Sequence, residues 1–258
     1  MSPASTNPGS SDAPTIDKAT FDRALTLLTA AAQPDAHGYV GLQTVPFRGH
    51  HLLASAVLAC APPHAVVLEG GVSSGYFARV LTSAGMVVDG LELDPDAAER
   101  ARLVCRSVWV GDLQAVDADQ LNGPYDVLLF GDTLEHIADP VAVLRRLRGT
   151  LRDRGALVVS IPNFANWAVR LQVLVGRFRY TDRGILDRTH LRFYTEQSVL
   201  ELFAAAGFDV VDMRGAIPVP FVRNAALCRL LHRVGNLRRS LFAYNFVVTG
   251  VPARDTDR

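Results

Sequence analysis

An acidic residue followed by a glycine-rich turn stands in the most regular region of the chain. Residues 66–81 read V-V-L-E-G-G-V-S-S-G-Y-F-A-R-V-L, which is an apolar run, then Glu69, then small residues, then apolar residues at helical spacing. This order predicts a strand, a tight turn and a helix, the first unit of a doubly wound sheet. Gly71 and Gly75 allow the backbone to approach a ligand, and the helix N-terminus offers it free N–H groups.

The spacing of the turn indicates which ligand it binds. It reads E-x-G-x-S-x-G from Glu69 through Gly71 and Ser73 to Gly75, and the dinucleotide pattern G-x-G-x-x-G is absent. An acidic residue before the first glycine favours a ligand with a cationic end, and S-adenosylmethionine has an ammonium and a sulfonium but no phosphate. The stretch resembles the first motif of class I S-adenosylmethionine-dependent methyltransferases. The resemblance implies that these four residues bind that cofactor; a turn that binds no ligand is the alternative.

A second acidic residue strengthens this interpretation. Residues 86–93 read as the next strand, and D-P-D at 94–96 opens a helix with Pro95 near its first position. Glu92 falls at the C-terminal end of the strand, where nucleotide-binding sheets carry an acidic residue that binds the ribose hydroxyls. It follows Gly75 at close to the usual offset of roughly 20 residues. A solvated surface carboxylate is the alternative for Glu92.

The next two strand ends carry further candidate cofactor residues. Gly111-Asp112-Leu113 follows a strand at 107–110, and G-D-T-L-E-H at 131–136 follows a fully apolar strand at 125–130. The resemblance implies that Asp112 accepts a hydrogen bond from the adenine amino group and that Leu113 packs on the ring. It also places Asp132 among the cofactor-binding residues.

A finer resemblance concerns the acceptor. From about Arg48 to Val251 the chain is similar to class I methyltransferases often encoded beside glycosyltransferases. The match is carried by residues 131–140 and by G-R-F-R-Y-T-D-R-G-I-L-D-R-T-H-L-R-F-Y-T at 176–195. It implies methylation of a hydroxyl on a saccharide or glycosylated small molecule, with an oligosaccharide on a metabolite or redox cofactor as one form. The alternatives are a phenol or quinone precursor as acceptor, a non-catalytic S-adenosylmethionine-binding partner protein, and a nicotinamide dehydrogenase, which the absent glycine pattern disfavours.

Methyl transfer from a sulfonium needs no acid, because the leaving group is neutral. It still needs an aligned acceptor and a base. We favour His136 as the base, with His190 as acceptor binder or alternative base, since a neutral imidazole accepts protons near neutral pH. Glu135 orients His136 or binds a substrate hydroxyl. A purely structural role is the alternative for each histidine. Asp132, Glu135 and His136 could instead hold a divalent cation, on one helical turn; we favour this less and assign no metal ligand.

Length and pattern predict one α/β domain: a doubly wound, seven-stranded, Rossmann-like sheet with helical cap insertions. The antiparallel last strand is implied by the resemblance. The expected strands are 66–68, 86–93, 107–110, 125–130, 156–162, 208–214 and 242–251. The expected organisation is a disordered tail at 1–14, N-terminal helices covering the cofactor cleft at 15–62, and the methyltransferase domain at 63–258, with a cap insertion at 163–194 and a basic helical insertion at 219–239.

Composition excludes some classes of function. The formal net charge is zero, which argues against a general nucleic-acid binder. Three widely separated cysteines indicate reduced thiols in a cytoplasmic protein, and the N-terminus does not read as a signal peptide. No stretch approaches the ~20 apolar residues of a transmembrane helix. We therefore expect a small-molecule or saccharide acceptor and no nucleic acid partner.

Two surface segments remain open in the sequence. The cap contains aromatic residues that could stack on a sugar ring or pack in a core: Trp167, Phe178, Tyr180 and Phe193. The insertion near the C-terminus carries Arg223, Arg229, Arg233, Arg238 and Arg239. We expect these arginines to form a solvated helix face, with a membrane-surface or anionic-substrate role as the alternative.

Overall fold

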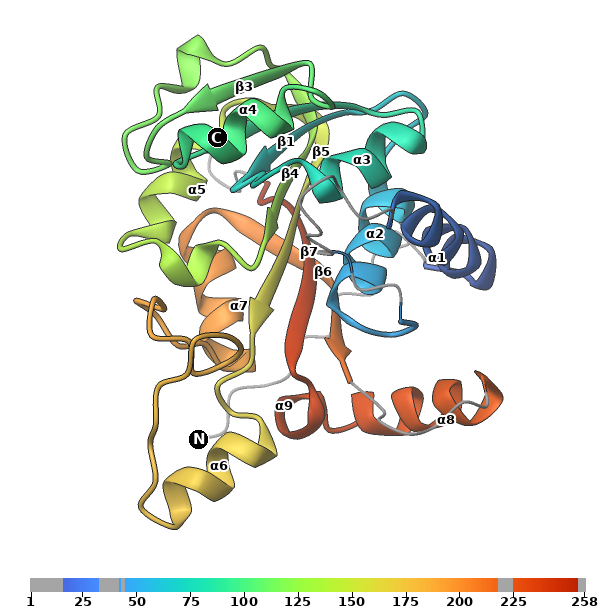
Figure 1. Ribbon diagram of the computed structural model, residues 1–258, viewed down its shortest axis with the longest axis vertical. Coiled ribbons are helices and arrows are strands. Elements are labelled where there is room, and N and C mark those ends of the chain that lie inside the picture. Colours follow the sequence, from blue (N-terminus) through green and yellow to red (C-terminus); the bar gives the residue numbers. More distant parts are fainter. Residues whose placement is uncertain (1–15, 33–41, 43–44, 218–224, 255–258) are drawn as a thin grey trace.

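The computed structural model describes residues 16–32, 42, 45–217 and 225–254. A seven-stranded sheet with the order β3-β2-β1-β4-β5-β7-β6 forms its centre (Figure 1). β7 is antiparallel to both of its neighbours, and the other strand pairs are parallel. The predicted doubly wound sheet with an antiparallel last strand is thereby confirmed. The strands are β1 Val66–Gly70, β2 Val87–Glu92, β3 Ser107–Val110, β4 Tyr125–Gly131, β5 Leu151–Pro162, β6 Phe208–Ala216 and β7 Asn245–Pro252.

Helices cover both faces of the sheet. One face carries α2 and α3, with α1 packed on α2, and the other carries α5 and α7 (Figure 1). After β5 the chain forms α6, and between β6 and β7 it forms α8 and α9. The helices are α1 Lys18–Ala31, α2 Gly49–Cys60, α3 Tyr76–Ser83, α4 Pro95–Ala101, α5 Pro140–Arg148, α6 Trp167–Leu174, α7 Glu196–Ala205, α8 Ala225–Asn236 and α9 Arg239–Phe242.

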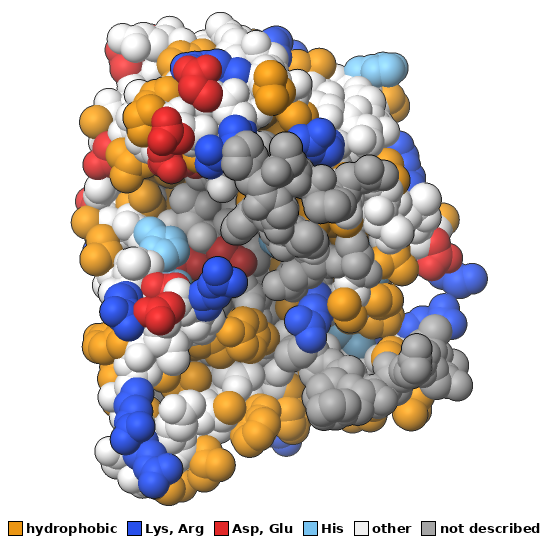
Figure 2. All heavy atoms as spheres, viewed as in Figure 1, with side chains coloured by type: hydrophobic (Ala, Val, Ile, Leu, Met, Phe, Trp, Pro, Cys, Tyr) orange, Lys and Arg blue, Asp and Glu red, His pale blue; other side chains and the backbone are white. Residues whose placement is uncertain are grey.

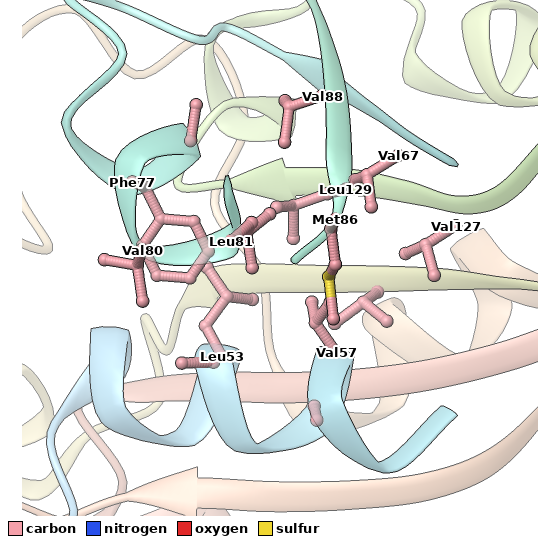
Figure 3. Close-up of a cluster of buried hydrophobic side chains, with 14 of the residues drawn as sticks. Leu53, Val57, Val67, Phe77, Val80, Leu81, Met86, Val88, Val127 and Leu129 are labelled. Atoms are coloured by element: carbon pink, nitrogen blue, oxygen red, sulfur yellow. The ribbon is translucent and has the colours of Figure 1, made fainter. Parts of the chain in front are cut away.

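A cluster of buried aliphatic side chains fixes the first strand–turn–helix unit. Leu53 of α2 and Phe77 of α3 point toward Val67 and Leu129 on the sheet, each 2 % exposed or less (Figure 3). Burying each such side chain contributes roughly 1.5–3 kcal/mol. The packing holds the N-terminus of α3 at the C-terminal edge of β1, where the glycine-rich turn lies.

Two strand starts differ from the sequence expectation by three residues or more, and the other strand boundaries differ by two residues or fewer. β5 begins at Leu151 and not at Ala156, because Leu151 pairs with Tyr125 before an irregularity in the register. Its first residues include exposed Arg152 and Arg154, so no apolar pattern marks them. β7 begins at Asn245 and not at residue 242, since residues 239–242 form α9.

Some expectations fall outside the described residues. These are the tail at 1–14, the stretch 219–224 of the basic insertion, and Arg223 within it. In the part of the chain that is described, no helix has the length and apolar character needed to cross a membrane.

Candidate active site

The turn after β1 has left-handed backbone conformations at three positions. Gly71, Ser73 and Gly75 all have positive φ, at 75°, 52° and 76°. A Cβ on Gly71 would lie 2.7 Å from Oγ1 of Thr133. Thr133 in turn donates a hydrogen bond to the carbonyl of Gly70. The loop after β4 and the turn after β1 pack closely together, and for that reason only glycine fits at position 71.

Glu69 lies beneath this turn as a buried acid. Its side chain is 5 % exposed, and Oε2 has no hydrogen-bond partner among the described residues. Burial raises its pKa to about 8, and the charge of Glu92 adds to the shift. An unpartnered buried acceptor of this kind is costly unless something cationic binds beside it. The predicted cationic end of the cofactor fits this position.

Glu92 holds the same turn from the adjacent strand. Its Oε2 accepts a hydrogen bond from the amide of Ser73 at 2.7 Å, and Oε1 accepts from the amides of Leu93 and Asp94 at 2.9 Å. The structure therefore brings Glu92 to the turn, and its predicted contact with the ribose hydroxyls remains a prediction. Glu92 orders the backbone on which a ribose would lie.

We expect Glu92→Ala to weaken S-adenosylmethionine binding about tenfold and to lower the free energy of unfolding by about 1–3 kcal/mol, because three amides lose their acceptor. Calorimetric titration and thermal melts measure the two effects. Glu99→Ala, which removes an exposed carboxylate from α4, is the matched control. Unchanged affinity in Glu92→Ala would refute its role.

Asp112 and Leu113, which follow β3, lie in different environments. Asp112 accepts a hydrogen bond from the amide of Gln114 at 2.8 Å and stays on the surface. The side chain of Leu113 is buried in the core cluster on the α5 and α7 face. A role of these two residues around adenine remains a prediction.

A cavity of about 330 Å³ opens at the ends of β4, β6 and β7. It is lined by Arg48, Gly49, His50, Asp132, Ala216, Tyr244 and Asn245. Asp132 has a positive φ of 52°, and its Oδ1 accepts hydrogen bonds from Ser160 Oγ at 2.7 Å and Asn245 Nδ2 at 2.6 Å. The strained backbone and these two donors fix the carboxylate at the cavity.

Sequence reasoning assigned no chemistry to most of this lining. The side chains of His50 and His51 point apart, and the ring of His51 contacts the carbonyl of Phe21 and the amide of Phe47. His50 instead lines the cavity, and burial lowers its pKa although Asp132 opposes the shift. Tyr244 was read only as part of a strand. No motif marked either residue, because their proximity depends on β7 pairing with β5.

Next to Asp132 in the chain, three side chains form a second cluster. Single ligand atoms of Glu135, His136 and His190 all lie within 4.8 Å of one another. The rings of the two histidines meet edge to face at 4.8 Å. The backbone carbonyl of Glu135 accepts hydrogen bonds from the amides of Leu191 and Arg192, which ties the cap to the end of β4. The predicted catalytic residues are thus brought together.

Backbone contacts favour one tautomer of each histidine. Nδ1 of His136 lies 3.2 Å from the carbonyl of Thr189, and Nδ1 of His190 lies 3.1 Å from the carbonyl of Ile185. A carbonyl only accepts, so each Nδ1 carries the proton and each Nε2 keeps its lone pair. The pKa of His190 is lowered by burial and by the neighbouring His136, so its ring is neutral at pH 7.

Glu135 is a buried acid in this cluster. It is 1 % exposed, and neither carboxyl oxygen has a hydrogen-bond partner among the described residues. Burial, together with the charge of Asp132, raises its pKa well above the usual value. The carboxyl lies 4.0 Å from Nε2 of His190.

The alternative cation set of Asp132, Glu135 and His136 is not the one that the structure assembles. The helix at this point is a single 3-10 turn, Leu134–His136, and Asp132 turns toward Ser160 and Asn245. His190 from the cap stands beside Glu135 and His136 instead.

The geometry described above matches a known domain. Residues 47–213 fit the family model of the methyltransferase domain. The chain belongs to this family. Its members use S-adenosylmethionine, and the buried, unpartnered Glu69 beneath the glycine turn fits that cofactor's cationic end.

Curated relatives of this methyltransferase domain are distant. An uncharacterized protein of Mycobacterium tuberculosis is 31% identical over 199 residues, which is 74% of this chain and 65% of that protein. The chain thus spans slightly under two thirds of the relative's length. A ubiquinone biosynthesis O-methyltransferase of Aeromonas salmonicida is 28% identical over 163 residues, covering 60% of this chain and 67% of the enzyme.

Solved structures agree on the fold. A TehB-like methyltransferase from Corynebacterium glutamicum has a TM-score of 0.51 at 17% identity, covering 92% of this chain and all of that one. The CcbJ methyltransferase from Streptomyces caelestis has a TM-score of 0.53 at 17% identity, covering 76% and 86%. At such identities these neighbours establish the methyltransferase fold and no more.

Proposed function

We propose that this chain transfers a methyl group from S-adenosylmethionine to a hydroxyl of a saccharide or glycosylated small molecule. The observation that carries the proposal is the cluster of Glu135, His136 and His190, which contains an exposed candidate base, His136, four residues after Asp132 of the cavity lining. Relatives named as ubiquinone biosynthesis O-methyltransferases support oxygen as the methylated atom.

The donor site uses the ends of neighbouring strands. Glu69 and Glu92 would hold the cofactor's cationic end and ribose, and Asp112 the adenine, while Gly71, Ser73 and Gly75 bring the backbone close. When bound there, the cofactor supplies an electrophilic methyl group on a neutral leaving group. Asp132, fixed by Ser160 and Asn245, would define the boundary between donor and acceptor.

The cap supplies an aromatic surface next to the histidines. Phe178 and Tyr180 are 44% and 55% exposed and meet edge to face at 5.2 Å. Phe193 lies 6.2 Å from both Phe178 and His190, measured between ring centroids. Exposed ring faces beside hydroxyl partners suit a sugar ring, which presents C–H groups on one face and hydroxyls at its edge. Trp167, half exposed at the start of α6, lies in the same cap.

The acceptor proton goes to His136. Of the two histidines, His136 is the exposed one, and its Nδ1 contact with Thr189 leaves Nε2 to accept. The side chain of His190 is 6% exposed and lies between the ring of His136 and the buried carboxyl of Glu135, so it would position the His136 ring. A sugar hydroxyl is a very weak acid, so proton removal accompanies attack, and a positioned base contributes about 10²–10⁴-fold.

We expect exhaustive treatment with EDTA to leave the methylation rate within about twofold, because a base, and not a Lewis acid, removes the proton. The assay measures turnover before and after chelation, with Mg²⁺ and Zn²⁺ added back separately. Loss of activity that a single cation restores would make Glu135, His136 and His190 metal ligands instead.

The direct test supplies the acceptor from the natural host. Purified protein is incubated with S-adenosylmethionine bearing a deuterated methyl group and with host extract, and products are followed by mass spectrometry. We expect the label in a species that releases a methylated sugar on acid hydrolysis. Label that remains in an aromatic fragment would favour a phenol or quinone precursor, and cofactor binding without any labelled product would favour a non-catalytic binding protein.

A further inference from the structure

One end of the molecule combines exposed apolar side chains with arginines. We call it the α6–α9 end and define it as residues 167–180 and 225–243. These two stretches contain no Asp or Glu. They contain seven arginines, at 170, 177, 179, 229, 233, 238 and 239. The whole chain has zero formal net charge, so this end is positive relative to the remainder.

The two stretches belong to one continuous end (Figure 1). Side-chain amides of Asn163 and Asn166, just before α6, donate hydrogen bonds to the carbonyl of Ala243, just after α9, at 2.9 Å. α8 packs against α9. In the view of Figure 2, orange and blue side chains cover the lower end over α6. The surface therefore spans both insertions.

α8 is fixed to the body by polar groups, and its leucines face elsewhere. Nε2 of His232 lies 3.1 Å from the carbonyl of Gly215, and Oδ1 of Asn236 accepts from the amide of Gly215 at 2.8 Å. The apolar residues at 227, 230, 231 and 234 repeat at the i, i+3, i+4, i+7 spacing of one helix face. Leu230 and Val234 are 56% and 54% exposed.

The other parts of this end have the same character. On α6 and just after it, Leu171, Leu174 and Val175 are 52%, 82% and 58% exposed. Leu237, between α8 and α9, is 80% exposed. Arg229 and Arg233 are exposed beside the α8 leucines, whereas Arg239 pairs with Glu196 at 2.8 Å.

We propose that the α6–α9 end docks on an anionic lipid bilayer, as a peripheral contact. Exposed aliphatic side chains with flanking arginines and no acidic residue are the features of a helix that lies in a membrane interface. A second copy of the chain fits less well, because a two-fold contact would place arginines against arginines. Nucleic acid would match the arginines but leave the leucines in water. The proposal does not depend on which acceptor the chain methylates.

Docking would bring the cavity close to the membrane. Tyr244 and Asn245 come two and three residues after the end of α9, and both line the cavity. An acceptor carried by the membrane would then enter beside the docked surface.

Vesicle flotation with the full chain tests the proposal without cofactor or acceptor. Vesicles contain phosphatidylcholine alone or equal parts phosphatidylcholine and phosphatidylglycerol. We expect binding to the anionic vesicles that weakens with added salt and is absent with phosphatidylcholine alone. Arg229→Ser with Arg233→Ser should lower binding about five-fold per arginine, while Arg100→Ser on α4, at the opposite end, should not.

A second pair of variants tests the apolar part. Leu230→Glu with Val234→Glu should abolish flotation, while Leu103→Glu, at a residue 85% exposed near α4, should leave it unchanged. Thermal melts confirm that each variant folds. The proposal is overturned if the wild-type chain does not float with anionic vesicles. It is also overturned if light scattering shows a dimer that the Leu230 and Val234 changes dissociate.

Discussion

Glu69→Gln is expected to make the protein more stable at pH 8 and a poorer binder of S-adenosylmethionine. Burial raises the pKa of Glu69 to about 8, so the folded chain retains a proton that the unfolded chain has released. The raised pKa contributes stability below pH 4.5 that is lost as the pH rises through 8. Glutamine does not ionise, so the variant does not lose this stability. We expect its free energy of unfolding to be about 2–4 kcal/mol higher than that of the wild type at pH 8.

Cofactor binding should change in the opposite direction. A cation beside Glu69 stabilises the carboxylate, so binding releases a proton and the wild-type affinity should rise between pH 6 and pH 8. The neutral amide loses a charge-assisted contact, which we expect to weaken binding about ten- to 100-fold and to remove the pH dependence. Denaturant melts and calorimetric titrations at both pH values measure these effects.

Two outcomes would contradict this role of Glu69. One is equal pH dependence of affinity in the wild type and in Glu69→Gln. The other is a variant that is less stable than the wild type at pH 8. Glu201→Gln, at an exposed residue of α7, serves as the matched control and should change neither quantity.

His136→Ala is expected to lower kcat on a saccharide acceptor about 10²–10⁴-fold and to leave S-adenosylmethionine affinity within about twofold, because the ring would contact the acceptor and not the cofactor. Single-turnover assays with saturating cofactor measure the rate. His64→Asn, at an exposed residue with φ 59° that asparagine tolerates, is the control.

The size of this loss also separates the acceptor classes. A phenol ionises far more readily than a sugar hydroxyl, so removal of the base should matter less for a phenol. A rate within threefold of wild type on the best saccharide would exclude His136 as the base. A large loss in His190→Ala with little in His136→Ala would transfer the role to His190.

Much of the proposed donor site was accessible from the sequence, because it follows strand ends. Glu69, Glu92 and Asp112 each follow or end an apolar run, and carboxyl ends of parallel strands meet at one edge of a sheet. The turn at Gly71 and Gly75 was predicted for the same reason, and both have positive φ.

The acceptor side depended on contacts that no local pattern records. His50 lies at the cavity through the packing of α2 on β5 and β7, and Tyr244 through the antiparallel pairing of β7. The direction of Asp132 also escaped prediction. It depends on a positive φ and on Ser160 and Asn245, which come from two other strands.

Methylation of a saccharide hydroxyl is tested most directly by turnover with a defined mixture of oligosaccharides and catechols. The quantity measured is the position of a deuterated methyl group in the products. Tandem mass spectrometry locates the label on each product. We expect label on a sugar oxygen, in amounts that fall about 10²–10⁴-fold in His136→Ala. Label confined to the catechols, at a rate that His136→Ala leaves unchanged, would contradict this expectation.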